Sequence, residues 1–207
     1  MFCDVTIPMQ TDGKTPMTKT TRDEAIIKPS ADGIAASMRA TGRKGPPPVH
    51  LWNPPFCGDI DMRIARDGTW FYLGTPIGRI ELVRLFAGII RREGDAYFLV
   101  TPVEKVGIKV EDAPFIAVDF DQTADGLAFV TNVGDRVIAG PDHQIRVTRD
   151  PATGEPRPYI HIRANLEALI DRKSFYRLVE IGEHQDGWFG LRSGVSFFPL
   201  IPASELT

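Results

Sequence analysis

Cysteine, long apolar runs and an excess of charge of either sign are all scarce or missing in this chain of 207 residues. Its two cysteines are too few for the disulfide framework of a small secreted domain. No apolar run approaches the roughly 20 residues that span a bilayer, and no apolar core of a secretory signal stands near the N-terminus. The net charge of −3 disfavours binding to duplex nucleic acid, which usually requires a basic excess. We therefore expect a cytoplasmic protein with no membrane and no duplex nucleic acid among its partners.

Familiar catalytic and metal-binding motifs are also missing. The chain has no G-x-x-x-x-G-K-[ST] loop, no G-x-G-x-x-G after a strand and no G-x-S-x-G, so classical nucleotide hydrolysis, dinucleotide redox chemistry and serine esterase chemistry are disfavoured. The four histidines lack the spacing of a zinc site. We assign no catalytic residue, no metal ligand and no cofactor from sequence, and we favour a protein that is not an enzyme.

What the sequence does contain is the composition of a folded protein. Hydrophobic residues make up 43% and charged residues 25%, which is ordinary for a globular chain of one large or two small domains. We interpret residues 1–46 as a mobile leader with one short helix, which Ser30 would cap and Gly42 would end. The remainder divides into an N-terminal unit, 47–113, and a C-terminal unit, 114–207.

Alternating and helical patterns predict the elements of the first unit and the start of the second. Residues 59–64 alternate between apolar and polar, and Asp67-Gly68 is a strong hairpin signal that leads into 69–73. The apolar spacing of 79–92 predicts a helix, with Gly94 as its C-cap. Short β-branched or aromatic runs predict further strands at 96–101, 105–111, 115–121, 126–132 and 135–139.

A strand–helix–strand phrase occurs twice, at 63–100 and at 144–179. In the second copy we expect a helix from Asn165 onwards, with Leu166, Leu169 and Ile170 facing inward. The strands expected in and after this copy are 143–149, 157–163, 175–182, 187–192 and 195–200. The pattern predicts an α+β fold of duplicated β-β-α-β units, dominated by antiparallel sheet, and a cleft between such units is a common place for a ligand.

The most suggestive group of polar side chains lies on one predicted strand and has one parity. The alternation places its members on one face, while Ile160 and Ile162 turn into the core. Guanidinium, imidazole and phenol groups together suit a planar anionic ligand. The alternative is a solvated sheet face whose arginines pair with acids on a neighbouring strand. The group consists of Arg157, Tyr159, His161 and Arg163.

Two carboxylates share one face of the first strand. Asp59 and Asp61 lie at positions i and i+2, a spacing that suits Mg²⁺ or Ca²⁺, but the adjacent Arg63 favours an ion pair instead. A structural ladder of salt bridges therefore competes with a metal or acid–base role for these residues.

Three further residues are candidate contributors to a ligand site. His143 follows a Gly140–Asp142 turn that would aim its ring into a cleft, or leave it on the surface. Arg79 ends a stretch that leads into the predicted helix, where backbone N–H groups would receive an oxyanion or would simply begin the helix. Lys105 would contribute from the wall opposite the basic strand.

Several phrases of the chain resemble, in order, a bacterial family catalogued as domain of unknown function 1285. The resemblance runs from about Pro47 to Pro199 and implies two related α+β units, the second like a pleckstrin-homology domain. It also implies a ligand site at their interface, for a nucleotide-like molecule in signalling. The phrases that carry it are Gly58–Ile64, Asp67–Tyr72, Thr101–Lys105, Thr131–Asp135, Gly140–His143 and Arg157–Tyr159.

The sequence thus leads to one hypothesis and two alternatives. The first is a non-enzymatic sensor that holds a small anionic, nucleotide-like ligand between the two units. One alternative is an enzyme that uses Asp59, Asp61 or His143 for acid–base or metal chemistry. The other is a module that binds a partner protein through a patch around Trp188 and Phe197-Phe198.

Overall fold

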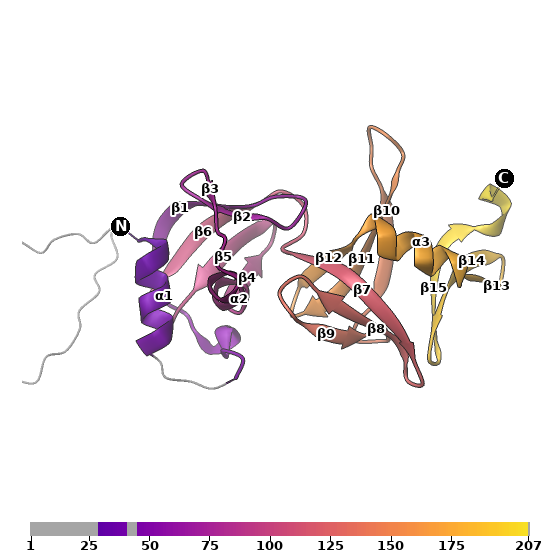
Figure 1. Ribbon diagram of the computed structural model, residues 1–207, viewed down its shortest axis with the longest axis horizontal. Helices are drawn as coiled ribbons and strands as arrows, with labels where there is room; N and C mark the ends of the chain where they lie inside the picture. Colours follow the sequence, from indigo (N-terminus) through magenta and orange to yellow (C-terminus); the bar gives the residue numbers. More distant parts are fainter. Residues whose placement is uncertain (1–28, 41–44, 207) are drawn as a thin grey trace, which may run out of the picture.

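The computed structural model describes residues 29–40 and 45–206, which form two units that lie side by side along the longest axis (Figure 1). The predicted mobility of residues 1–28 concerns residues outside this described part. No helix within the described ranges is long and apolar enough to cross a membrane.

The N-terminal unit is a curled six-stranded sheet with two α-helices. Its strand order is β3-β2-β1-β6-β5-β4, and all neighbours are antiparallel except the central pair of β1 and β6. The elements are α1 (Ala31–Ala40), the 3₁₀ turn η1 (Val49–Leu51), β1 (Phe56–Ile64), β2 (Trp70–Tyr72), β3 (Thr75–Pro76), α2 (Ile80–Ala87), β4 (Ile90–Glu93), β5 (Ala96–Val100) and β6 (Lys105–Val110).

The C-terminal unit repeats this sheet and adds a second, smaller one. The larger sheet has the order β10-β11-β12-β7-β8-β9, again with one parallel pair at its centre, β12 and β7. A three-stranded antiparallel sheet, β13-β14-β15, follows the helix α3. The elements are β7 (Phe115–Thr123), β8 (Gly126–Thr131), β9 (Arg136–Ile138), β10 (Ile145–Arg149), β11 (Pro156–Arg163), β12 (Leu166–Ile170), α3 (Arg172–Glu180), β13 (Glu183–Gln185), β14 (Trp188–Ser193), β15 (Ser196–Pro202) and η2 (Ala203–Glu205).

The predicted duplication and α+β class are confirmed, but the phase of the repeat differs from the one expected. In each unit the first strand pairs in parallel with the sixth, and the strands follow the order third, second, first, sixth, fifth, fourth. The repeat therefore matches 56–110 with 115–170 instead of 63–100 with 144–179. A helix, α2, joins the third and fourth strands of the first unit, whereas bends join β9 to β10 in the second.

The helix expected from Asn165 and the strand expected at 175–182 were wrong. Residues Leu166–Ile170 form β12, and their burial alternates with a period of two. The helix α3 begins only at Arg172, because Asp171 caps it by accepting a hydrogen bond of 2.8 Å from the backbone N–H of Ser174. Ser174 and Leu178, four residues apart, are its buried positions.

The first unit also contains a helix that is shorter than predicted. The helix α2 ends at Ala87, and the β-branched pair Ile89-Ile90 leads into β4. Gly94, with φ of 59°, turns the hairpin between β4 and β5, where we had expected a helix cap. The hairpin at Asp67-Gly68 is confirmed, with the Asp67 carboxylate accepting a bond of 2.9 Å from the N–H of Thr69.

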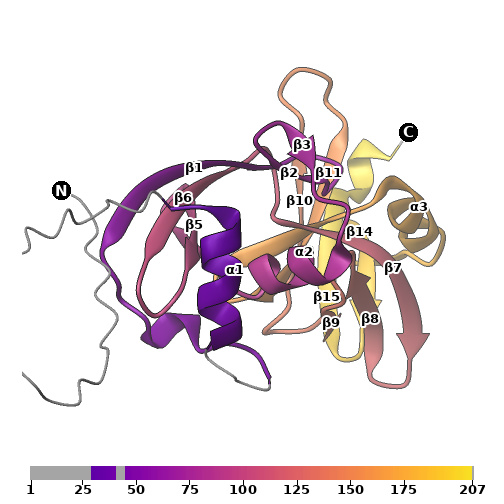
Figure 2. The same ribbon diagram turned by 60° about the vertical axis from the view of Figure 1, so that its left-hand side comes forward.

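The short helix that we predicted within residues 1–46 is present as α1 and packs beside α2 (Figure 2). Ser30 caps it as expected, because its hydroxyl accepts a hydrogen bond of 3.1 Å from the N–H of Gly33. Ile34 is completely buried, so this helix is part of the core of the first unit.

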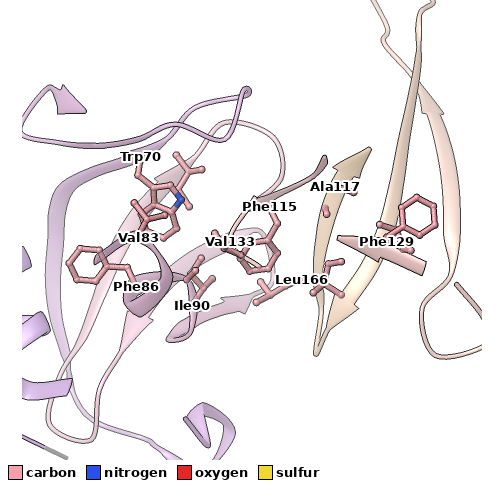
Figure 3. Close-up of a cluster of buried hydrophobic side chains, with 14 of the residues drawn as sticks. Trp70, Val83, Phe86, Ile90, Phe115, Ala117, Phe129, Val133 and Leu166 are labelled. Carbon is pink, nitrogen blue, oxygen red and sulfur yellow. The ribbon is translucent and has the colours of Figure 1, made fainter. Parts of the chain in front are cut away.

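A single hydrophobic core runs through both units and across their junction (Figure 3). Figure 3 shows side chains of the first unit followed by a group at the junction and then by the interior of the second sheet. Apolar burial therefore joins the two units as well as stabilising each of them. The labelled members, in that order, are Trp70, Val83, Phe86 and Ile90, then Phe115, Val133 and Leu166, then Ala117 and Phe129.

Candidate functional site at the junction of the units

A pocket of about 560 Å³ lies where the two units meet. Its walls come from the segment before η1, from α2 and β4 of the first unit, and from two turns of the second unit. Those turns are the one between β8 and β9 and the one between β11 and β12. Its volume falls within the roughly 300–1,000 Å³ of typical small-molecule sites.

Much of this pocket is apolar. The segment Pro46-Pro47 and Val49 forms one wall, and Ile90 and Leu166 belong to the part nearest the shared core. Apolar walls of this kind favour the burial of a ring or an aliphatic group of a ligand.

Arg163 is the one member of the predicted basic strand that lines the pocket. Its guanidinium pairs with Asp135 at 2.5 Å, donates a bond of 2.9 Å to the carbonyl of Ala87 and lies 4.8 Å above the Phe115 ring. Ala87 is the last residue of α2, so Arg163 places a positive charge at the negative end of that helix. This arginine therefore ties the second unit to the first.

Arg91, in β4, lies at the same junction. It donates a hydrogen bond of 2.7 Å to the carbonyl of Trp52, and it forms an ion pair with Glu93. Its Nε atom is buried and has no hydrogen-bond partner among the described residues. A buried N–H without an acceptor is costly, so an acceptor supplied by a ligand would be favourable there.

Arg84, in α2, is the exposed cation of the pocket. It forms no ion pair with a carboxylate of the described part of the chain, and it lies against the turn at Gly134 of the second unit. With Arg91 and Arg163 it gives three lining arginines against one lining carboxylate, Asp135. The pocket consequently has an excess of positive charge and one guanidinium available to an anion.

The turn between β11 and β12 is held in place around this pocket. Ala164 has φ of 48°, a conformation that is unfavourable for a residue with a Cβ atom. Asn165 donates a bond of 3.0 Å to the carbonyl of Arg92 and so fixes the turn on the first unit. His161 places its two ring nitrogens at 2.6 Å from the carbonyl of Asp142 and 2.5 Å from that of Ala164.

Both acceptors around the His161 ring are carbonyl oxygens, which cannot donate. Contacts with these two carbonyls hold the His161 ring against the turn. His143 lies beside it, with ring centroids 6.0 Å apart and its Nδ1 at 3.0 Å from the carbonyl of His161. Both histidines were predicted site residues. They contact the turn and the end of β11 but do not line the pocket.

Arg157 and Tyr159, in β11, do not line the pocket and contact Asp112 in the segment that connects the two units. The Tyr159 hydroxyl donates a bond of 2.7 Å to Asp112, and burial together with this carboxylate raises the pKa of Tyr159. Arg157 lies 3.5 Å from Asp112 and 2.8 Å from Asp150. The two side chains thus pair with Asp112 and Asp150, which lie in connections between strands and not on a neighbouring strand.

The other predicted residues lie outside the junction pocket. Arg79 is exposed just before α2, and Lys105 forms an ion pair of 3.0 Å with Glu93 on the outer face of the first sheet. Asp59 and Asp61 are exposed and form no ion pair with any described residue. Within 29–40 and 45–206 no three His, Cys, Asp or Glu side chains cluster as metal ligands would.

Sequence reasoning missed Arg84, Arg91 and Asn165. The helix predicted over 79–92 included Arg84 and Arg91 but gave neither residue a role in a site, because the helical pattern contains no information about the second unit. A signal was available in Ile89-Ile90 followed by Gly94, since two β-branched residues before a glycine favour a strand and hairpin over the end of a helix.

These features define a class: a protein of two duplicated α+β units whose curled sheets share one core and enclose a pocket at their junction. The family models agree with that division. The chain belongs to the DUF1285 family, since residues 47–113 match the model described as domain of unknown function (DUF1285), N-terminal domain, and residues 114–200 match the corresponding C-terminal domain.

Two solved structures of the same family are similar to the chain. A DUF1285 family protein from Silicibacter pomeroyi DSS-3 is 65% identical, with a TM-score of 0.79, and the match covers 86% of this chain and 99% of that one. A DUF1285 family protein from Shewanella baltica OS155 is 32% identical over 57% of this chain and 90% of that one, with a TM-score of 0.48. No curated protein matches the chain.

Proposed function

We propose that the protein is a non-enzymatic, cytoplasmic sensor that binds a small anionic, nucleotide-like ligand in the pocket between its two units. The observation that carries the proposal is the combination of apolar walls with three arginines, one of which, Arg84, has no carboxylate partner among the described residues. A planar ring against the proline wall and an anionic group at Arg84 and Arg91 would use both features.

The position of the pocket suits signalling because both units contribute to its walls. A ligand that contacts both would favour the arrangement in which they are docked, and its binding free energy would add to the stability of that arrangement. A partner protein that distinguishes the docked arrangement would then receive the signal.

The test is a thermal-shift screen of the full chain with nucleotides and phosphorylated metabolites, followed by calorimetric titration of each hit. At a ligand concentration of 100 times Kd, binding adds about 2.7 kcal/mol of stability, which raises Tm by roughly 5–10 °C for a protein of this size. We expect at least one stabilising ligand.

The decisive variant is Arg84→Glu, because Arg84 is exposed and its replacement breaks no observed ion pair. We expect it to abolish the shift and to leave the Tm of the free protein almost unchanged. Lys173→Glu, on the exposed face of α3, makes the same charge change away from the pocket and should keep the shift. A screen without hits on well-folded protein, or equal shifts in both variants, would refute the proposal.

Two further charge reversals, at Arg163 and at Arg79, distinguish a ligand site in the junction pocket from one at the start of α2. Reversing the charge of Arg163 would break its contacts with Asp135 and Ala87, so a lost shift in that variant would report damage to the junction as well as binding. Arg79 is exposed and lies away from the pocket. The Arg79→Glu variant should bind the ligand like the native protein if the junction pocket is the site. It should lose ligand binding if the start of α2 is the site.

A second candidate function, binding of a partner protein, is favoured by one observation. Trp188, at the start of β14, remains 42% exposed, although Phe198 of the patch predicted around it is buried. Exposed tryptophan is enriched at protein interfaces. If this patch is the functional surface, Trp188→Ala should abolish binding of a partner chain and leave the nucleotide-dependent Tm shift intact.

A further inference from the structure

A second hollow, of about 200 Å³, lies within the C-terminal unit and shares no lining residue with the junction pocket. It opens between α3, the strands β10 and β15, and the C-terminal turn η2, which gather at one end of the molecule (Figure 1). The hydroxyls, histidines and carboxylates that would indicate hydrolytic or metal chemistry are missing from its described lining.

The walls of this hollow are almost entirely apolar. Val147 from β10, Phe175 from α3, Phe189 from β14 and Leu200 from β15 line it, and each is only half-buried. Val179 on α3 retains 37% of its exposure. These side chains meet around the hollow without completing one another's burial, so an apolar group placed among them would remove further apolar surface from water.

Arg149 is the single charged residue of the lining. Its guanidinium is loosely held, because the Gly154 carbonyl lies at 3.4 Å and the Glu205 carboxylate at 3.5 Å, both at the outer limit of such contacts. Its side chain remains 55% exposed. Other arginines of the same sheet are held more closely: Arg146 forms two bonds to Glu167, of 2.6 and 2.5 Å.

We propose that this hollow binds a small amphipathic carboxylate, an alkanoate or arylalkanoate whose apolar chain fills the hollow and whose carboxylate pairs with Arg149. A carboxylate matches the planar fork of a guanidinium, and the ligand would take the place that Glu205 holds loosely at the rim. The volume lies below the range for drug-sized ligands, so a short chain fits and a long-chain lipid does not.

The length of the chain gives the first test. The full protein is titrated calorimetrically with straight-chain carboxylates from butanoate to dodecanoate. Each methylene that enters the hollow should strengthen binding about fourfold, and the gain should stop once the hollow is full. The alcohol octanol tests the charge, since it should bind about tenfold more weakly than octanoate.

Three variants test the residues. Arg149→Gln should weaken octanoate binding about tenfold and leave octanol binding unchanged. Glu205→Gln removes the competing carboxylate and should strengthen octanoate binding two- to threefold. Val179→Trp, which fills the hollow from the exposed face of α3, should weaken both ligands. The matched control Arg79→Gln removes an exposed arginine of the other unit and should change neither.

The outcomes are distinct. Equal affinity for octanoate and octanol, or an Arg149→Gln variant that binds octanoate normally, would overturn the role of Arg149. If the Arg149 variant does not fold, an unchanged affinity in Glu205→Gln overturns it instead. An absence of carboxylate binding, or binding of an apolar peptide in preference to every short carboxylate, would overturn the proposal itself. None of these results bears on the Arg84 test at the junction.

Discussion

The two units have the same sheet topology and differ most where the third strand leads to the fourth. In the first unit the helix α2 fills this connection, and in the second a short run of bends does. The second unit instead places its helix, α3, after the sixth strand and adds a small sheet. The same sheet is therefore completed in two ways, by an inserted helix in one unit and by appended elements in the other.

Each of the two candidate sites follows from this difference. The junction pocket is lined by α2, which only the first unit has, and by two turns of the second. The smaller hollow is lined by α3 and by β14 and β15, the additions of the second unit. Both hollows are thus lined by elements that one unit has and the other lacks.

The largest expected effect concerns the core that joins the units. Phe115 is completely buried at the junction, whereas Phe129 is completely buried inside the second sheet. Replacing either with alanine should cost about 3–5 kcal/mol of unfolding free energy. Phe115→Ala should also split the denaturant-induced transition into two, because it removes apolar contact between the units.

The measurement follows urea unfolding by circular dichroism and by tryptophan fluorescence, since Trp70 lies in the first unit and Trp188 in the second. Phe129→Ala serves as the control and should unfold in one step. A single transition in both variants would show that the shared core around Phe115 does not couple the units.

A smaller effect is expected at two glycines of the first unit. Gly68 has φ of 81°, and a Cβ atom there would lie 2.7 Å from Ile116 and from Asn132 of the second unit. Gly74 has φ of 73°, and a Cβ atom there would meet nothing within 4 Å. Gly74→Ala should cost about 1–2 kcal/mol for the backbone conformation alone, and Gly68→Ala should cost more because the contact between the units must also move.

Equilibrium unfolding of both variants gives this comparison directly. Both variants carry the cost of a positive φ, so the difference between their losses of unfolding free energy measures the contact between the units at Gly68. Equal losses of unfolding free energy would mean that Ile116 and Asn132 move away from Gly68 at no cost.

The smallest effect concerns two glutamates at opposite ends of β6. Burial raises the pKa of Glu104, so its contribution to stability is fully present below the unfolded pKa and is lost as pH rises through the folded pKa. The hydrogen bond from Arg63 lowers the pKa of Glu111, whose contribution is present above the unfolded pKa and is lost as pH falls through the folded pKa.

At pH 7, Glu104→Gln should therefore raise Tm by about 1 °C and Glu111→Gln should lower it slightly. Both differences should shrink as the pH is lowered through the range where carboxylates titrate. Tm measured by calorimetry between pH 3 and 8 checks both signs, and two variants that shift in the same direction would contradict the assignment.

Local patterns predicted much of the fold. The alternation in β1, the Asp67-Gly68 hairpin and the Ser30 cap of α1 were read correctly, because each depends on neighbours in the sequence. The segment Leu166–Ile170 was misread, because its apolar residues fit a helix and a buried strand alike over five residues. The pairing of β12 with β7 and β11 resolved that ambiguity, and those partners are distant in the sequence.

The candidate site was less predictable than the fold. The alternation of the strand predicted that four side chains share one face: Arg157, Tyr159, His161 and Arg163. In the structure the strand register shifts between His161 and Arg163. In addition, Arg157 pairs with Asp112 and Arg163 pairs with Asp135, so the four side chains do not meet at one site. Those acids lie in connections between strands, whose positions no strand pattern fixes.

The amino-acid sequence by itself determined two related α+β units and the types of their strands, because hydrophobic period and turn chemistry act over a few residues. Only the tertiary structure decided that Arg84, Arg91 and Arg163 meet around one pocket, since they come from one helix and two strands, α2, β4 and β11, that packing brings together. Long-range burial sets such neighbours, and it depends on the whole chain at once.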